Sequence, residues 1–134
     1  MGAGSKSSVG DPVAAAKFNQ GFHKITWIID TELSTGVVQN IQVPIATDHT
    51  VVEAHARVAT APAGAAIRLD LLKNGVSLHD SDGDKCTIAA GEHVGSTSTF
   101  NDNSLSDGDY LELEIEQVGS TTAGTGLVFV AELE

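Results

Sequence analysis

The chain has 134 residues, 41% of them hydrophobic, and a formal net charge of -11 at pH 7. This length suits one domain with its own hydrophobic core, and the composition is not that of a disordered chain. The acidic charge repels nucleic-acid phosphates, so we expect no nucleic-acid partner. No segment approaches the roughly 18 apolar residues of a membrane span, and the N-terminus lacks the apolar core of a signal peptide. We therefore expect a protein that is made in a cytoplasm and has no membrane partner.

The first 21 residues differ in composition from the rest of the chain. Residues 1–11 are mostly Gly, Ser and Ala, with almost nothing to bury, and the run at 13–18 is too short for an independent helix. We predict an extended N-terminal arm over residues 1–21, followed by a domain over residues 22–134. Because fixing such an arm costs conformational entropy, it needs a surface to order on. That surface is a partner or the arm's own domain, and we favour the partner.

The clearest strand prediction is residues 105–118, which read LSDGDYLELEIEQV. After a turn at 106–109, apolar and acidic residues alternate with a period of two, which is typical of a strand with one buried and one solvated face. The apolar face would carry Leu111, Leu113 and Ile115. The other face would carry Glu112, Glu114 and Glu116, which repel one another unless cations or a basic partner lie opposite.

The same period of two predicts strands throughout the rest of the domain, and Asn74–Gly75 is the strongest signal for a tight hairpin. A turn is expected at residues 30–36 and a strand at residues 37–43, after which Pro44 indicates a strand end or a sheet edge. Val128 and Val130 make both faces of the last strand apolar, which indicates a central strand or a subunit interface. The residues expected to face the core are Ile25, Trp27 and Ile29; Val37, Ile41 and Val43; Val52, Ala54, Ala56 and Val58; Ile67, Leu69 and Leu71; and Leu127, Phe129, Ala131 and Leu133.

These short strands, with turns every 8–12 residues and no long helical pattern, predict an all-β fold. We expect a single β-sandwich or jelly roll of about eight strands, with the extended N-terminal arm attached to it. No second domain and no internal repeat is indicated.

The acidic loop at residues 79–85 is the sharpest candidate for a metal site, because Asp80, Asp82 and Asp84 alternate around a glycine. An EF-hand loop that begins at Asp80 would need Gly at position 85 and Glu at position 91. The chain has Lys85 and Gly91 there, so the motif fails. We interpret the loop as a solvated acidic turn, and whether it holds a cation stays open.

No other pattern points to a metal, a cofactor or a catalytic group. The five histidines (His23, His49, His55, His79 and His93) lack the spacing of a helical zinc site. His55 is expected on the solvated face of its strand, in a ladder with Glu53 and Arg57. The single cysteine, Cys86, excludes an intrachain disulfide and is expected in the core. With no nucleophile elbow and no phosphate loop, we predict no catalytic, cofactor-binding or metal-binding residues, and no enzyme.

Three segments together resemble a known group of proteins. They are residues 60–67 (TAPAGAAI) with 72–75 (LKNG), residues 87–91 (TIAAG), and residues 105–111 (LSDGDYL) with 117–120 (QVGS). Their order is similar to that in the small β-sandwich domains of tailed-bacteriophage virion proteins, which occur in capsid decoration (cement) proteins and in tail or fibre tips. The likeness covers residues 25–134 and rests mainly on turns and strands.

The resemblance implies a structural virion protein that binds the major capsid protein on the outside of an assembled head and stabilises the head. It also implies a homotrimer or homodimer, an arm that grips the shell, and a location on the capsid surface after synthesis in the host cytoplasm. Deletion of residues 1–21 should then leave the domain folded but abolish attachment. The alternative is a receptor- or glycan-binding domain of a phage tail appendage, which usually needs exposed aromatic rings.

Overall fold

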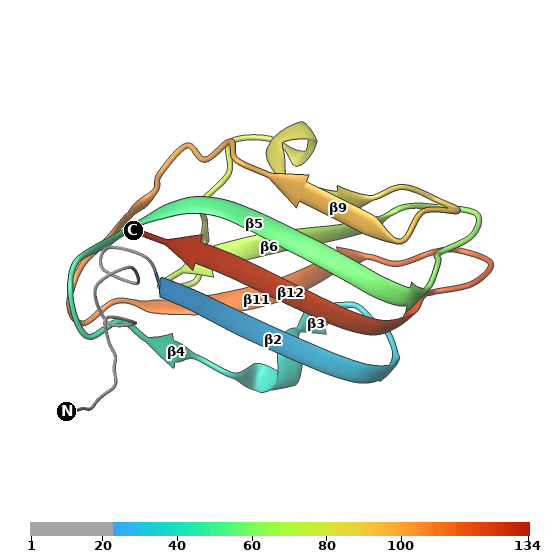
Figure 1. Ribbon diagram of the computed structural model, residues 1–134, viewed down its shortest axis with the longest axis horizontal. Helices are drawn as coiled ribbons and strands as arrows, with labels where there is room; N and C mark the ends of the chain where they lie inside the picture. Colours follow the sequence, from blue (N-terminus) through green and yellow to red (C-terminus); the bar gives the residue numbers. More distant parts are fainter. Residues whose placement is uncertain (1–22) are drawn as a thin grey trace, which may run out of the picture.

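Two antiparallel β-sheets face each other in the computed structural model, which describes residues 23–134 (Figure 1). The front sheet of Figure 1 has the order β10-β5-β12-β2, with β9 also paired to β5. The back sheet has the order β3-β11-β6-β7, with β4 also paired to β11 and β8 to β6. The predicted arm at 1–21 lies outside the described residues. The strands are β2 (His23–Glu32), β3 (Gly36–Val37), β4 (Val43–Pro44), β5 (His49–Thr60), β6 (Ile67–Lys73), β7 (Val76–Ser77), β8 (Cys86–Ile88), β9 (Val94–Thr97), β10 (Ser104–Leu105), β11 (Tyr110–Gln117) and β12 (Thr125–Leu133).

The strand order confirms the predicted β-sandwich of the jelly-roll type. Strands β3 and β4 both pair with β11, β7 and β8 both pair with β6, and β9 and β10 both pair with β5. If each of these pairs counts as one interrupted strand, the described residues contain eight strands, four in each sheet. The chain passes from one sheet to the other between successive strands such as β5 and β6, so that neighbours in a sheet come from distant parts of the sequence.

The core lies between the two sheets and is built from alternate residues of the strands, as the period of two predicts. Leu111, Leu113 and Ile115 of β11 are buried. The indole of Trp27 packs edge-to-face on Phe129, with ring centroids 5.8 Å apart. The other predicted core residues that are fully buried are Ala54, Ala56, Val58, Ile67, Leu69, Leu71, Leu127, Ala131 and Leu133.

Two turn predictions are also confirmed. Asn74 and Gly75 have φ of 54° and 84° and close the hairpin between β6 and β7, which requires positive φ at both positions. Pro44 is the last residue of β4, and its pairing with Tyr110 places it at a strand end. Strand β12 lies between β2 and β5 and is therefore a central strand, one of the two predicted possibilities. Its outer side is not buried, because Val128 is 40% exposed.

The predicted strand over residues 37–43 is wrong. A 3-10 helix, η1 (Val38–Asn40), separates β3 from β4, and Gln39 and Asn40 both have positive φ. The turn rotates the chain so that Val38 is buried while Ile41 is 41% exposed. Asparagine tolerates the left-handed conformation better than most residues do, so Asn40 is the residue in this segment that argues against a regular strand.

The sequence predictions also differ from the structure at two other places, a strand end and an irregularity in the alternation. Strand β2 continues to Glu32, so the predicted turn at 30–36 is shorter than expected. In β5 the pairing with β12 shifts by one residue, because Glu132 pairs with Glu53 but Leu133 pairs with Val51. This irregularity turns Val51 into the core and leaves Val52 37% exposed, the reverse of the prediction.

The two 3-10 helices, η1 and η2 (Asp82–Asp84), are the helical segments of the described residues. Neither of them, nor any other part of residues 23–134, forms a helix with the length and hydropathy that a bilayer crossing requires.

Candidate interaction face

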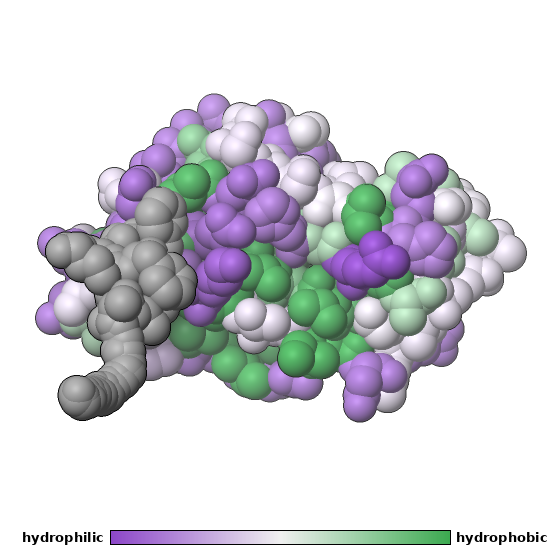
Figure 2. Space-filling model, viewed as in Figure 1, coloured by the Kyte–Doolittle hydropathy of each residue, from purple (hydrophilic) through white to green (hydrophobic). Residues whose placement is uncertain are grey.

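The outer surface of the front sheet, which we call the front face, carries apolar side chains that nothing in the described residues covers. Ile28 of β2 is 59% exposed, Val94 of β9 is 55% exposed and Val128 of β12 is 40% exposed. Figure 2 shows hydrophobic side chains gathered across the middle of this face, with hydrophilic ones around them. These residues point outward because their neighbours in each strand point into the core.

The front face is hollowed between β9, β5 and β12. A shallow depression of about 570 Å³ is lined by His55, Ala56, Arg57, Val94, Gly95, Ser96, Val128 and Val130. Its floor is the sheet itself, and its lining combines the three valines with the polar groups of β5 and β9. Apolar side chains and arginine are common at the centre of protein interfaces, so the lining of this depression resembles an interface in composition.

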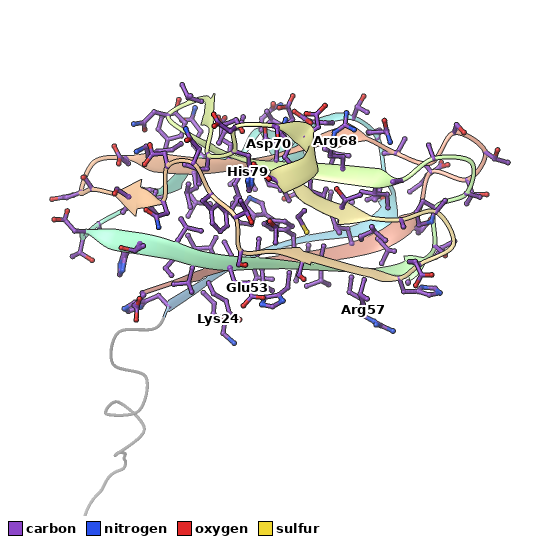
Figure 3. The ribbon with its side chains drawn as sticks, turned by 90° about the horizontal axis from the view of Figure 1, so that it is seen from above. Lys24, Glu53, Arg57, Arg68, Asp70 and His79 are labelled. Atoms are coloured by element: carbon purple, nitrogen blue, oxygen red, sulfur yellow. The ribbon has the colours of Figure 1, made fainter. Side chains whose placement is uncertain are left out.

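The front face carries cations as well as carboxylates. Lys24, Glu53 and Arg57 point outward on the same side of the sandwich (Figure 3). Glu132 lies between Lys24 and Glu53 in the register, whereas Arg57 lies opposite Val128. Among residues 23–134, these two cations make no ion pair, whereas the other Lys and Arg residues all do. These two cations reduce, at this face, the repulsion that the net charge of -11 would otherwise produce toward an acidic partner.

One end of the front face holds a cluster of His55, Glu53 and Glu132. The Nε2 atom of His55 lies 3.6 Å from Oε1 of Glu53 and 3.2 Å from Oε2 of Glu132. Glu53 and Glu132 are direct cross-strand neighbours of β5 and β12, and Lys24 of β2 is the neighbour of Glu132 on its other side. The predicted ladder of His55 with Glu53 is present, but its other member is Glu132 rather than Arg57.

The opposite side of the sandwich, the back face, is organised around the ammonium group of Lys85. Its Nζ atom lies 2.8 Å from Oε2 of Glu116, 3.0 Å from Oδ1 of Asp82 and 3.5 Å from Oδ2 of Asp70. Arg68 donates a hydrogen bond of 3.1 Å to Glu116. Lys85 and Arg68 are thus cations beside Glu116, whereas Glu112 and Glu114, the other two glutamates of the predicted row, make no ion pair among the described residues.

The residues around Lys85 have shifted pKa values. Burial opposes the ionisation of Glu116, but hydrogen bonds from Lys85 and Arg68 outweigh it and lower the pKa of Glu116. Partial burial also opposes the charge on Lys85, but its hydrogen bonds to Glu116 and Asp82 raise its pKa. Burial raises the pKa of Asp70, and the hydrogen bond from Ser77 and the charge of Lys85 counteract the rise.

The acidic loop that the sequence marked as a cation candidate forms η2 above this network. Asp82 pairs with Lys85 at 3.0 Å and with Arg68 at 3.8 Å, so its charge is already met by protein cations. Within residues 23–134, Asp80, Asp82 and Asp84 do not belong to any group of three or more side chains whose ligand atoms lie close enough to hold a metal ion. The loop covers β6, which is why Asp70 is only 2% exposed although it points outward from the sandwich (Figure 3).

The remaining predicted residues lie in structural positions. Cys86 is 1% exposed in the core, as predicted, and burial raises the pKa of its thiol to about 12. His79 stacks on Phe100 with ring centroids 4.9 Å apart, and its Nδ1 atom hydrogen-bonds to the carbonyl oxygen of Thr99. His23 and His49 contact each other edge-to-face at 4.7 Å.

Comparison with known proteins gives no family. No protein-family model and no curated protein matches the chain. A solved structure of the carbohydrate-binding module CBM36 in complex with calcium and xylotriose is similar with a TM-score of 0.34 and 12% sequence identity, over 83% of this chain and 71% of that chain. A likeness at this level concerns the sandwich architecture alone and says nothing about a ligand of this chain.

Proposed function

We propose that the chain is a structural module that acts by binding, as a capsid decoration protein on the outer surface of an assembled bacteriophage head. The front face is the observation that supports this proposal, because it exposes apolar side chains and carries Lys24 and Arg57, the two cations that make no ion pair among residues 23–134. The virion resemblance of the sequence supplies the partner, the major capsid protein. Self-association into a homotrimer or homodimer on the lattice belongs to the same proposal.

The energetics of attachment follow from the exposed side chains of the front face. Burial of the remaining exposed part of Ile28, Val94 and Val128 contributes about 1 kcal/mol for each residue. A protein that binds only the assembled lattice stabilises the lattice by mass action. The acidic back face, with Glu112, Glu114 and Asp82, would then remain in the solvent and keep the decorated particles soluble.

A pair of valine variants tests the attachment surface. We expect Val128→Asp to lower binding to isolated phage heads that were assembled without this protein, because an aspartate there cannot be desolvated. Val76→Asp is the matched control, since Val76 is 69% exposed but lies on the β6–β7 hairpin of the other sheet. Co-sedimentation with the heads measures binding, and circular dichroism checks that both variants are folded.

Two results would contradict this proposal. One is a wild-type protein that does not co-sediment with heads of the phage that encodes it. The other is an equal loss of binding in Val76→Asp and Val128→Asp, which would mean that charge rather than the front face controls attachment.

The alternative function, a receptor- or glycan-binding domain of a tail appendage, would need a different kind of surface. Within residues 23–134 the aromatic rings of Trp27 and Phe129 are buried, and those of Phe100 and Tyr110 are half-buried. A sugar would therefore have few rings to stack on in this part of the chain. Specific binding of a host glycan or surface protein by the isolated protein, without binding to heads, would favour this alternative.

A further inference from the structure

We propose that Glu53, His55 and Glu132 form a binding site for a divalent transition-metal ion such as zinc at one end of the front face. The sequence predicts no metal site there, because the spacing of Glu53 and His55 alone gives only two ligands. The pairing of β5 with β12 supplies the third, Glu132, from the other end of the domain. The three ligand atoms lie within 4.8 Å of one another.

The distances between the ligand atoms fit a zinc ion. With bonds of about 2.1 Å, a tetrahedral zinc ion holds its ligand atoms about 3.4 Å apart. The Nε2 atom of His55 lies 3.6 Å from Oε1 of Glu53 and 3.2 Å from Oε2 of Glu132. His55 thus already stands near each glutamate at the separation that a shared metal ion would impose, and the two carboxylate oxygens lie within 4.8 Å of each other.

The electrostatics of the cluster favour a cation. Two glutamates directly opposite each other on neighbouring strands repel. Among residues 23–134, no Lys or Arg lies within ion-pair distance of either one, although Lys24 is the direct cross-strand neighbour of Glu132 and Arg57 lies on the same face. Their only close positive partner is His55, and only when it is protonated. A metal ion bound by the neutral imidazole would neutralise both carboxylates instead.

A second group of possible metal ligands differs from this cluster because a lysine of the protein already meets its charges. Asp70, Glu114 and Glu116 on the back face also bring three carboxylates together. There the Nζ atom of Lys85 lies 2.8 Å from Glu116 and 3.5 Å from Asp70. The protein itself therefore supplies a lysine as the cation on the back face, whereas no Lys or Arg of residues 23–134 reaches ion-pair distance of Glu53 or Glu132.

The site leaves room for ligands from outside. The side chains of Glu53, His55 and Glu132 are 39%, 44% and 32% exposed, so one side of a bound ion faces the solvent. Three protein ligands leave a fourth tetrahedral position to water or to a group of another molecule. Since Val130, beside His55, lines the depression of the front face, the ion would lie at the rim of that face.

Titration of the full-length protein with zinc chloride tests this proposal, because it needs no capsid partner and is independent of the proposed function. At pH 7.5, after treatment with chelator, we expect calorimetry to show one ion for each chain. His55→Ala and Glu132→Gln should each weaken binding by more than about tenfold. Cobalt should bind with the visible absorption of a low-coordinate ion, and this absorption should disappear in both variants.

His49→Ala is the control, because His23 and His49 form a pair of neighbouring histidine rings apart from the proposed ligands. The proposal predicts that this variant binds zinc as the wild type does. Binding that is lost in His49→Ala but kept in His55→Ala would overturn it. An absence of binding at millimolar zinc, or weak binding that neither His55→Ala nor Glu132→Gln changes, would overturn it as well.

Discussion

Replacement of Lys85 by methionine should cause a large loss of stability, because it leaves buried carboxylates without their cation. The Lys85 side chain is only 10% exposed, and that of Asp70 is 3% exposed. Methionine keeps most of the length and the apolar stem of lysine but removes the ammonium group. The variant therefore tests the charge rather than the packing of the loop over β6.

The structure sets the size of the expected effect. Loss of one partner from a buried ion pair costs about 3–5 kcal/mol. Glu116 keeps Arg68 at 3.1 Å and Asp70 keeps the hydroxyl of Ser77 at 2.7 Å, so the low end of this range applies. A loss of about 3 kcal/mol corresponds to a fall in the melting temperature of about 10 °C for a domain of this size.

Urea and thermal unfolding, followed by circular dichroism, measure the loss. Lys24→Met is the control, because Lys24 makes no ion pair among the described residues, and a change within about 0.5 kcal/mol is expected there. Asp70→Asn combined with Lys85→Met should be less destabilised than the sum of the two single variants, because the buried charge is gone. Equal effects of Lys85→Met and Lys24→Met would refute the reasoning.

Three further predictions concern acid stability, the buried thiol and the close contact between β9 and β8 at Gly95. The pKa of Glu116 is lowered from 4.5, so its carboxylate stabilises the fold above that pH, and this contribution is lost as the pH falls below it. Glu116→Gln should therefore flatten the dependence of the unfolding free energy on pH in this acid range. An unchanged slope would contradict the role of Glu116. The Cys86 thiol should react with a disulfide reagent more than about 100-fold more slowly in the native protein than in urea, and a fast native reaction would mean that the core opens readily. A Cβ atom at Gly95 would overlap the carbonyl oxygen of Thr87, so Gly95→Ala should cost about 1–3 kcal/mol in urea unfolding. Gly83→Ala should cost far less, because its Cβ atom would meet only the hydroxyl oxygen of Ser81, at 3.9 Å.

The local sequence pattern determined most of the fold. Alternation of apolar and polar residues needs only neighbours in the chain, and it identified the buried faces of strands such as β11 and β12. The Asn74–Gly75 turn was predictable for the same reason, since its backbone conformation depends on those two residues. Where a backbone irregularity intervened, at η1 and at Val52, the alternation shifted and the prediction failed.

The tertiary structure alone decided what the polar residues do. Glu132 meets Glu53 and His55 only because the last strand pairs beside β5, and no local pattern carries that pairing. Lys85 reaches Glu116 only because the loop at 79–85 folds over the back sheet. Periodicity specifies which side of a strand a residue faces, but strand order specifies its neighbours across the sheet, and the neighbours determine whether a charge is paired, buried or free to bind an ion.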